Sequence, residues 1–365
     1  MTKVSLDDLA WASAVPDDDR TLAEVFCLTF VKGVGEREAL LRLGAQEGTF
    51  GRRTLSEVVE EMESYDAGYP DVAASLNLGE WTVLIEPDGF NGAHLPLLAA
   101  LSRGTEAVSA LRHDYASDHF GYAVDGTLVT SFDPIAPQYR HGADPDRLLA
   151  LMRDAGFRPE PGESHEDDET EMADRAATRA LYVAGRITGV VPALDALRGT
   201  FLSAHVEPWF SEAAEPPDTG VDDGLAAAFL AASPQRRRRV AVAETERLAA
   251  LLGLAHAPGL TEALAEVREG RPVRVPGGSP LGRTVRSLLT ESRRAGVSLN
   301  DPGTRDRMTE EERTLAFQGG WFAQALRAVL AGEPGPGVFR PLCRGPRPLK
   351  APEHREVVLQ DLRGA

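Results

Sequence analysis

The side chains best suited to chemistry are acidic and basic groups near the ends of expected strands. Glu86 and Asp88 follow one apolar run, and Asp133 follows another. Arg103 and Arg140 are near enough in the sequence to pair with them. Paired carboxylates can exchange protons with a substrate, and loop residues at strand ends often carry function. Turn caps and structural ion pairs account for the same residues, so we interpret the five as binding residues and assign no catalytic residue.

A run of four arginines, Arg236, Arg237, Arg238 and Arg239, is the second candidate site. The run begins an expected helix, where cations oppose the helix dipole, so helix stability does not account for it. Three interpretations stay open: a solvated helix start, a docking surface for an acidic protein segment, and a contact with nucleic acid. Among the functional interpretations we favour docking, because residues 223–365 contain five aromatic residues and no tyrosine to stack on bases.

Histidine, cysteine and glycine patterns predict no metal site and no cofactor. His113 and His119 flank an acidic segment, but its composition is typical of a loop between strands. Cys27 falls inside an expected strand, where cysteine is most often a small buried side chain, and the reactivity of Cys343 stays open. The sequence lacks Gly-x-Ser-x-Gly, Gly-x-Gly-x-x-Gly and Gly-Lys-Ser/Thr motifs. Whether the protein is an enzyme therefore stays uncertain.

The charge of the chain is unevenly distributed. The whole sequence of 365 residues carries a net charge of −17. Residues 1–222 hold 17 Lys and Arg against 40 Asp and Glu, whereas residues 223–365 hold 22 against 16. The excess of acidic residues in 1–222 excludes nucleic-acid binding by that part, whereas the excess of basic residues in 223–365 does not exclude it. The opposite charges predict that the two parts dock on each other or that one of them docks on an unknown protein partner.

The elements that would position these residues indicate an α+β front part. Its fold class is an antiparallel sheet with flanking helices, followed by a mainly α-helical C-terminal domain. Thr54 and Glu57 have the spacing of a capping box, which predicts a helix from residue 55. The clearest hairpin signal is Asp125-Gly126, which predicts that Val124 pairs with Thr127 and Tyr122 with Val129.

Composition shifts divide the chain into three regions. Residues 1–158 form the α+β domain. Residues 159–222 form an acidic linker that contains two helices, and these helices are expected to pack on the α+β domain. Residues 223–365 form the helical domain with a proline-rich C-terminal tail. Its helices are expected at 223–232, 237–254, 260–269, 281–294 and 309–331.

The sequence also predicts where the protein works. The first residues contain no apolar run typical of a signal peptide, and no stretch reaches the roughly 18 apolar residues of a membrane span. Two cysteines at opposite ends of the chain predict no disulfide framework. We therefore expect a cytoplasmic protein that does not enter the membrane.

Several segments of the front part resemble an uncharacterised actinobacterial family known as a domain of unknown function. The resemblance covers roughly residues 8–205, and the back half resembles no family. Its motifs lie in turns and at strand ends and imply no reaction. They are Phe30-Val31-Lys32-Gly33, Leu41-Arg42-Leu43-Gly44-Ala45, Trp81 to Phe90, Leu101 to Thr105, Phe132-Asp133-Pro134 with Arg140, and Ile187-Thr188-Gly189-Val190.

These observations favour a protein-interaction or regulatory role. The first alternative is an enzyme, a hydrolase or tailoring enzyme, which would need Glu86, Asp88, Asp133 and Arg140 to converge at a pocket. The second alternative is a nucleic-acid-associated regulator that acts through residues 236–239.

Overall fold

The computed structural model describes residues 4–13, 22, 25–113, 117–160, 175–211, 220–330 and 333–364. The chain forms two compact units, Met1–Glu63 with Asp71–Ala213, and Ser64–Pro70 with Ala214–Ala365. The change of unit after Ala213 falls within the expected linker at 159–222. The assignment of Ser64–Pro70 to the second unit has no counterpart in the sequence analysis. Parts of the acidic linker, residues 161–174 and 212–219, lie outside the described residues.

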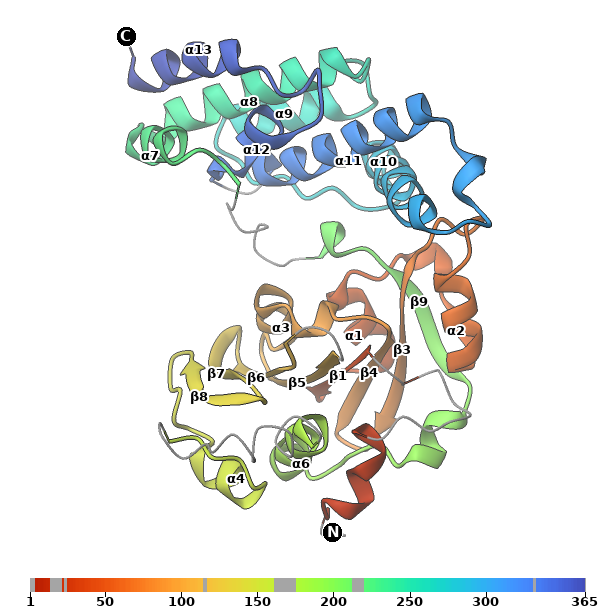
Figure 1. Cartoon of the computed structure of the whole chain (residues 1–365). Coiled ribbons are helices and arrows are strands. Elements are labelled where there is room, and N and C mark those ends of the chain that lie inside the picture. The colour runs from red at the N-terminus through yellow and green to blue at the C-terminus, as the bar shows by residue number, and fades with distance from the viewer. Residues whose placement is uncertain are drawn as a thin grey trace. The chain divides into compact units, whose positions relative to one another are not determined.

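The first unit is built on one antiparallel sheet of nine strands (Figure 1). The strands follow one another across the sheet in the order β2-β9-β3-β4-β1-β5-β6-β7-β8. The expected fold class, an α+β sheet domain followed by a helical region, is therefore confirmed. The strands are β1 Val25–Lys32, β2 Gly51–Arg53, β3 Asp71–Leu78, β4 Trp81–Pro87, β5 Glu106–His113, β6 His119–Val124, β7 Thr127–Asp133, β8 Ala136–His141 and β9 Phe201–Val206.

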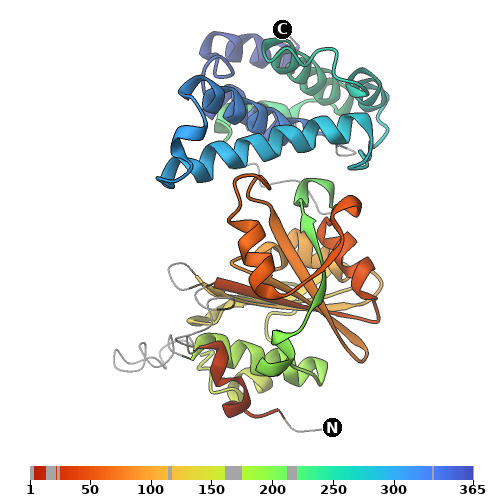
Figure 2. The same cartoon turned by 90° about the vertical axis from the view of Figure 1, so that its right-hand side faces the viewer.

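Helices cover both faces of this sheet (Figures 1 and 2). Because side chains alternate along a strand, Phe26, Leu28 and Phe30 of β1 point to one face, and Cys27 and Thr29 point to the other. The first face packs on α6, η1 and α4, and the second on α1 and α3. The helices are η1 Asp7–Ala12, α1 Glu36–Leu43, α2 Leu55–Met62, α3 Leu95–Leu101, α4 Leu149–Asp154 and α6 Ala176–Thr188.

The Asp125-Gly126 hairpin forms as predicted, with one change of register. Both turn residues have positive φ, +48° and +77°, and Val124 lies opposite Thr127. Tyr122 lies opposite Thr130 rather than Val129, because a β-bulge next to Tyr122 shifts the register by one residue.

Four strands, β2, β3, β8 and β9, were not predicted from the sequence. β3 is rich in Ala, Ser and Asn, which have weak strand preference, so only its neighbours identify it. β8 contains Pro137, which is tolerated because the strand lies at the edge of the sheet. The second helix expected after residue 190 is wrong: the segment contains Pro192 and Gly199 and forms a short 3-10 turn followed by β9.

The capping box at the start of α2 gives the first prediction. The Thr54 hydroxyl accepts a hydrogen bond from the Glu57 amide at 3.3 Å, and the Thr54 amide donates to the Glu57 carboxylate at 2.7 Å. Thr54→Ala should therefore lower the free energy of unfolding by about 1 kcal/mol in urea denaturation. Glu57→Gln keeps an acceptor and should cost less. Equal stability of Thr54→Ala and wild type would contradict the role of this cap.

The second unit consists mainly of helices. The five helices expected there all form, with their ends within about four residues of the prediction. The proline-rich stretch after residue 332 forms only short helical segments, and α13 follows it. Within the described residues, no helix combines the length and apolar character needed to cross a membrane. The helices are α7 Asp223–Ala231, α8 Pro234–Leu251, α9 Leu260–Arg268, α10 Pro280–Val297, α11 Glu310–Leu330, α12 Arg340–Arg344 and α13 Pro352–Arg363.

Candidate functional site

The predicted carboxylates lie at the same end of the sheet but on strands that are far apart. Glu86 is near the end of β4 and Asp133 is the last residue of β7, with β1, β5 and β6 between these strands. Four strand spacings of about 4.8 Å separate them by about 19 Å. Asp88 is exposed and begins the loop that follows β4. The structure therefore does not bring Glu86 and Asp133 together as an acid and base pair.

The other strand-end residues have local partners. Arg140 donates to the Asp146 carboxylate at 2.9 Å and to the Pro137 and Pro159 carbonyls at 2.7 Å. The Asp133 carboxylate accepts a hydrogen bond from the Ile135 amide at 2.8 Å, as a turn cap does. Arg103 is exposed near the end of α3. Ligand binding by these side chains stays a prediction.

Glu86 is a buried carboxylate that holds the loop after β4. It is only 2% exposed and accepts hydrogen bonds from the amides of Asn91 at 3.0 Å and Gly92 at 2.8 Å. Burial raises the pKa of Glu86 to about 7, although these hydrogen bonds favour the charged form. Such a group can hold or release a proton near neutral pH, and here its two oxygens are occupied by backbone amides.

A row of small polar side chains continues from Glu86 across the sheet. The Cys27 thiol lies 3.3 Å from the Ser109 hydroxyl, which in turn lies 3.4 Å from that of Thr29. All three side chains are fully buried. Burial, with repulsion from Glu86, raises the pKa of the Cys27 thiol to about 12, so the reactive thiolate is absent at neutral pH. The expectation that Cys27 is a small buried side chain is confirmed.

One histidine of the first unit pairs with a serine. His119 Nε2 lies 2.8 Å from the Ser131 hydroxyl, and burial lowers the pKa of His119 to about 4. Ser131 is fully buried, so a substrate cannot reach its hydroxyl. No group of three His, Cys, Asp or Glu side chains suited to a metal ion occurs within the described residues.

The arginine run lies in the first turns of α8. Arg236 donates to the Leu362 carbonyl at 3.3 Å, and Arg238 donates to the Glu333 carboxylate at 2.9 Å. Arg239 is exposed. Ser233 caps the start of α8, because its hydroxyl accepts a hydrogen bond from the Arg236 amide. At least two of the four arginines thus form hydrogen bonds within the second unit, which is typical of a structural role.

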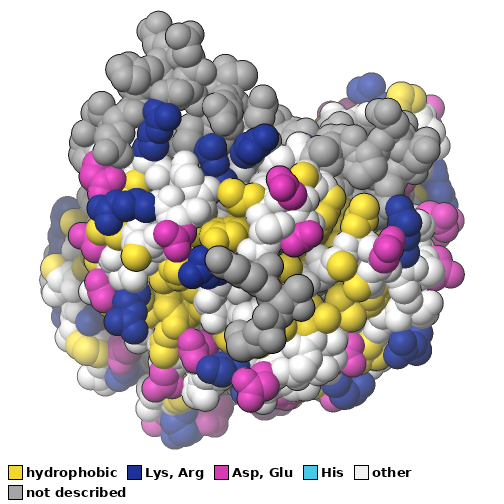
Figure 3. All heavy atoms as spheres, turned by 90° about the horizontal axis from the view of Figure 1, so that it is seen from below, with side chains coloured by type: hydrophobic (Ala, Val, Ile, Leu, Met, Phe, Trp, Pro, Cys, Tyr) yellow, Lys and Arg dark blue, Asp and Glu magenta, His cyan; other side chains and the backbone are white. Residues whose placement is uncertain are grey.

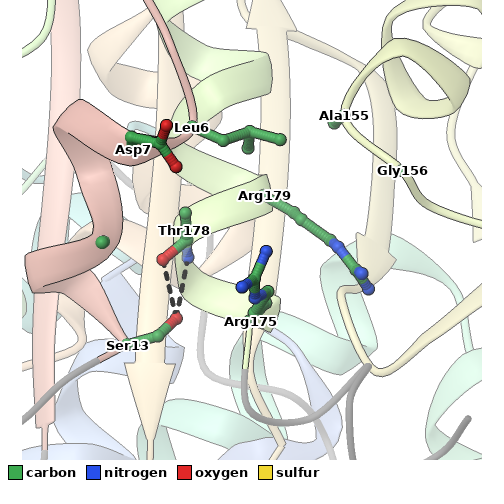
Figure 4. Close-up of a pocket in the computed structure, with 9 residues that line it drawn as sticks. Leu6, Asp7, Ser13, Ala155, Gly156, Arg175, Thr178 and Arg179 are labelled. Carbon is green, nitrogen blue, oxygen red and sulfur yellow. Dashed lines mark hydrogen bonds between the residues drawn. The ribbon is translucent and has the colours of Figure 1, made fainter.

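A cavity that the sequence analysis did not anticipate lies between η1, the start of α6 and the end of α4 (Figure 4). It has a volume of about 280 Å³. Arg175 and Arg179 lie one turn apart at the start of α6, and Arg179 extends toward Gly156 (Figure 4). The sequence feature that could have indicated this cavity is a pair of arginines, four residues apart, that follows an acidic segment. The cavity is lined by Leu6, Asp7, Ala10, Ser13, Ala155, Gly156, Arg175, Thr178 and Arg179.

Hydrogen bonds fix two of the cavity walls to each other. The Thr178 hydroxyl bonds to the Ser13 hydroxyl at 2.8 Å and to the Leu9 carbonyl at 3.2 Å (Figure 4). On the surface that contains η1, α4 and α6, described acidic and basic side chains are interspersed with apolar ones (Figure 3).

The second unit contains a further cluster that sequence reasoning missed, around the segment Ser64–Pro70. Arg294 donates to the carbonyls of Tyr65 at 3.0 Å and Asp66 at 2.9 Å. Arg307 pairs with the Asp66 carboxylate at 2.5 Å and lies over the Tyr65 ring at 3.9 Å from its centre. Basic side chains of the helical unit thus hold a short acidic and aromatic segment.

Comparison with known proteins places the first unit in a family. A family of unknown function, DUF6461, matches residues 2–207, which is more than half of the chain. No curated protein matches the sequence, and no solved structure matches it either. The match agrees with the range of the resemblance found in the sequence, and residues 208–365 lie outside it. The chain belongs to the DUF6461 family of unknown function.

Proposed function

We propose that the protein is a protein-interaction or regulatory protein that acts through contacts of its basic helical unit with acidic segments. The observation that supports this role most directly is that Arg294 and Arg307 bind the segment Ser64–Pro70 through hydrogen bonds and an ion pair. This segment connects α2 with β3 in the chain but belongs to the second compact unit. We propose the cytoplasm as its location, which suits the two free cysteines.

The contacts of this segment are specific rather than merely electrostatic. The Tyr69 hydroxyl lies 2.9 Å from that of Thr304, and Tyr65 and Tyr69 meet edge to face. A Cβ added at Gly68 would lie 2.4 Å from the Thr290 side chain. An aromatic pair, an acid and a glycine therefore fit one surface of α10 and the turn after it. Such a surface is suited to recognising a short protein segment.

The rival functions have weaker support. An enzyme would need its strand-end residues to converge, but Glu86 and Asp133 are separated by three strands. A nucleic-acid regulator would need the run 236–239 for phosphates, but Arg236 and Arg238 are bonded inside the second unit. Salt-sensitive binding of the full chain to duplex DNA at low salt would restore the second of these alternatives.

The hold on Ser64–Pro70 gives a prediction for the full-length chain. Replacing Arg294 and Arg307 together by alanine should speed amide hydrogen exchange of this segment about tenfold or more, because it loses an ion pair and two hydrogen bonds. Arg283→Ala, on the same helix α10 but bonded to the Gly278 carbonyl, is the matched control and should leave exchange unchanged. Unchanged exchange in the double variant would show that these arginines do not hold the segment.

The interaction role itself is tested by affinity purification of the tagged full-length chain from its native host. We expect a protein that is retained at low salt, released at high salt and altered in amount by the Arg294 and Arg307 double replacement. If no protein is enriched over a tag-only control at low salt, the proposed interaction role is wrong.

A further inference from the structure

We propose that the loop after β4, residues 88–94, is a lid that opens as the pH rises and uncovers a buried row of polar side chains. The row consists of Glu86, Cys27, Thr29 and Ser109, and the lid contains the short 3-10 helix η4, Asn91–Ala93. The lid lies in the first unit and does not involve the arginine contacts of the second unit. This proposal therefore goes beyond the proposed interaction role and is tested independently of it.

The backbone of the lid lies directly over the polar row. Ala93 packs against Cys27 in a small buried cluster. A Cβ added at Gly92 would overlap the Thr29 hydroxyl, so the backbone itself covers this side chain. Cys27 and Thr29 are fully buried. Movement of the lid away from the sheet would therefore expose the row to solvent.

The side chains of the lid contribute little apolar packing. Phe90 is its one large apolar residue, and this side chain is 46% exposed, with its ring beside those of His94 and His113. Asp88, the first residue of the lid, has a φ of +50°, a left-handed conformation that is unfavourable for residues other than glycine. A loop with such contacts opens at a lower free-energy cost than the strands beneath it.

Glu86 couples the position of the lid to the pH. Its carboxylate accepts hydrogen bonds from the amides of Asn91 and Gly92, so the lid must break both bonds to open. With the lid closed, burial raises the pKa of Glu86 to about 7, against 4.5 for the model carboxyl. When the lid opens, water reaches the carboxyl group and its pKa returns toward 4.5. Between these two values opening releases a proton, so a rise in pH favours the open lid.

Other titratable side chains also face the lid or Glu86. Asp71 raises the pKa of Glu86 further by repulsion. His94 acts in the opposite direction: burial lowers its pKa, so opening would let it take up a proton and would be favoured at lower pH. Comparison with a variant that lacks only the Glu86 carboxyl removes this contribution. The groups that face the lid or Glu86 are Asp71 on β3, Cys27 on β1, His94 before α3, His113 on β5 and His119 on β6.

The reactivity of Cys27 measures the opening in the full-length protein. In a Cys343→Ser background Cys27 is the single thiol. Its rate of reaction with 4,4′-dithiodipyridine from pH 5.5 to 7.5 is divided by the rate for free cysteine at the same pH, which removes the pH dependence of thiolate formation. We expect this ratio to rise about tenfold or more relative to that of Glu86→Gln in the same background. Glu80→Gln, exposed in the turn before β4, is the matched control and should retain the full rise.

Dilute urea separates opening of the lid from global unfolding. Opening exposes little surface, so the rate of Cys27 labelling should stay nearly constant in urea, whereas labelling through global unfolding rises steeply. A steep rise with urea at every pH overturns the proposal. So does a rate ratio that is independent of pH, or one that rises equally in Glu86→Gln.

Hydrogen exchange keeps the proposal testable if Glu86→Gln does not fold. In the wild-type protein, amide protection of residues 88–94, corrected for the chemical exchange rate, should fall about tenfold or more between pH 5.5 and 7.5. Protection of helix α6 over the same range serves as the internal control and should fall less. Equal changes in the two segments would contradict a lid that opens by itself.

Discussion

Replacing Gly92 by alanine should lower the free energy of unfolding by about 3 to 4 kcal/mol. The new Cβ would lie 2.0 Å from the Thr29 hydroxyl oxygen and 3.0 Å from Glu86 Oε1. Both neighbours are buried on central strands and cannot move aside, so the loop that carries Gly92 must shift. That shift breaks the 2.8 Å hydrogen bond from the Gly92 amide to Glu86. The estimate adds the cost of overpacking to that of a lost hydrogen bond to a charged group.

The matched control for Gly92→Ala is Gly48→Ala. No atom lies within 4 Å of a Cβ at Gly48, so that variant should be neutral or slightly more stable than wild type. Urea denaturation of both variants measures the difference. Adding Thr29→Ala to Gly92→Ala should recover part of the loss, because it removes the oxygen in the clash. Strictly additive losses in the double variant would contradict the steric explanation.

The sequence predicts the parts of the fold that local chemistry determines. The Asp125-Gly126 turn, the Thr54 cap and the long helices of the second unit all form where their residues indicate. Strand β3 is different: its two alanines and its serine form a strand because β4 and β9 pair with it on either side. Such a strand depends on partners that are distant in the sequence, and pattern analysis does not find it.

The candidate sites depend even more on tertiary structure. The sequence indicates Glu86 as a strand-end carboxylate, but its burial and its two amide donors depend on how the loop folds back over β1. The cavity joins η1 to α6, whose sequences are more than 160 residues apart. No local pattern links Ser13 with Thr178, although hydrogen bonds connect them. Sequence reasoning thus found an important residue and missed the cavity, because a cavity exists only where distant segments meet.

The buried carboxylate of Glu86 should make the protein less stable as the pH rises toward neutrality. Its pKa is about 7 in the folded protein, against 4.5 for the model carboxyl. Between these two values the folded protein keeps a proton that the unfolded chain releases, so raising the pH favours unfolding. The stabilising contribution is complete below pH 4.5 and is lost as the pH rises to about 7. The difference of pKa corresponds to about 3 kcal/mol.

Urea denaturation of wild type and Glu86→Gln over this range of pH isolates the effect. Glutamine cannot titrate, so wild type should lose about 3 kcal/mol relative to the variant between about pH 4.5 and 7.5. Acids elsewhere in the chain whose pKa is lowered, such as Glu57 and Asp301, titrate alike in both proteins and cancel in the comparison. The matched control is Glu80→Gln, which is exposed in the turn before β4 and should retain the wild-type slope. Parallel pH profiles for wild type and Glu86→Gln would mean that Glu86 is ionised throughout this range, stabilised by the amides of Asn91 and Gly92.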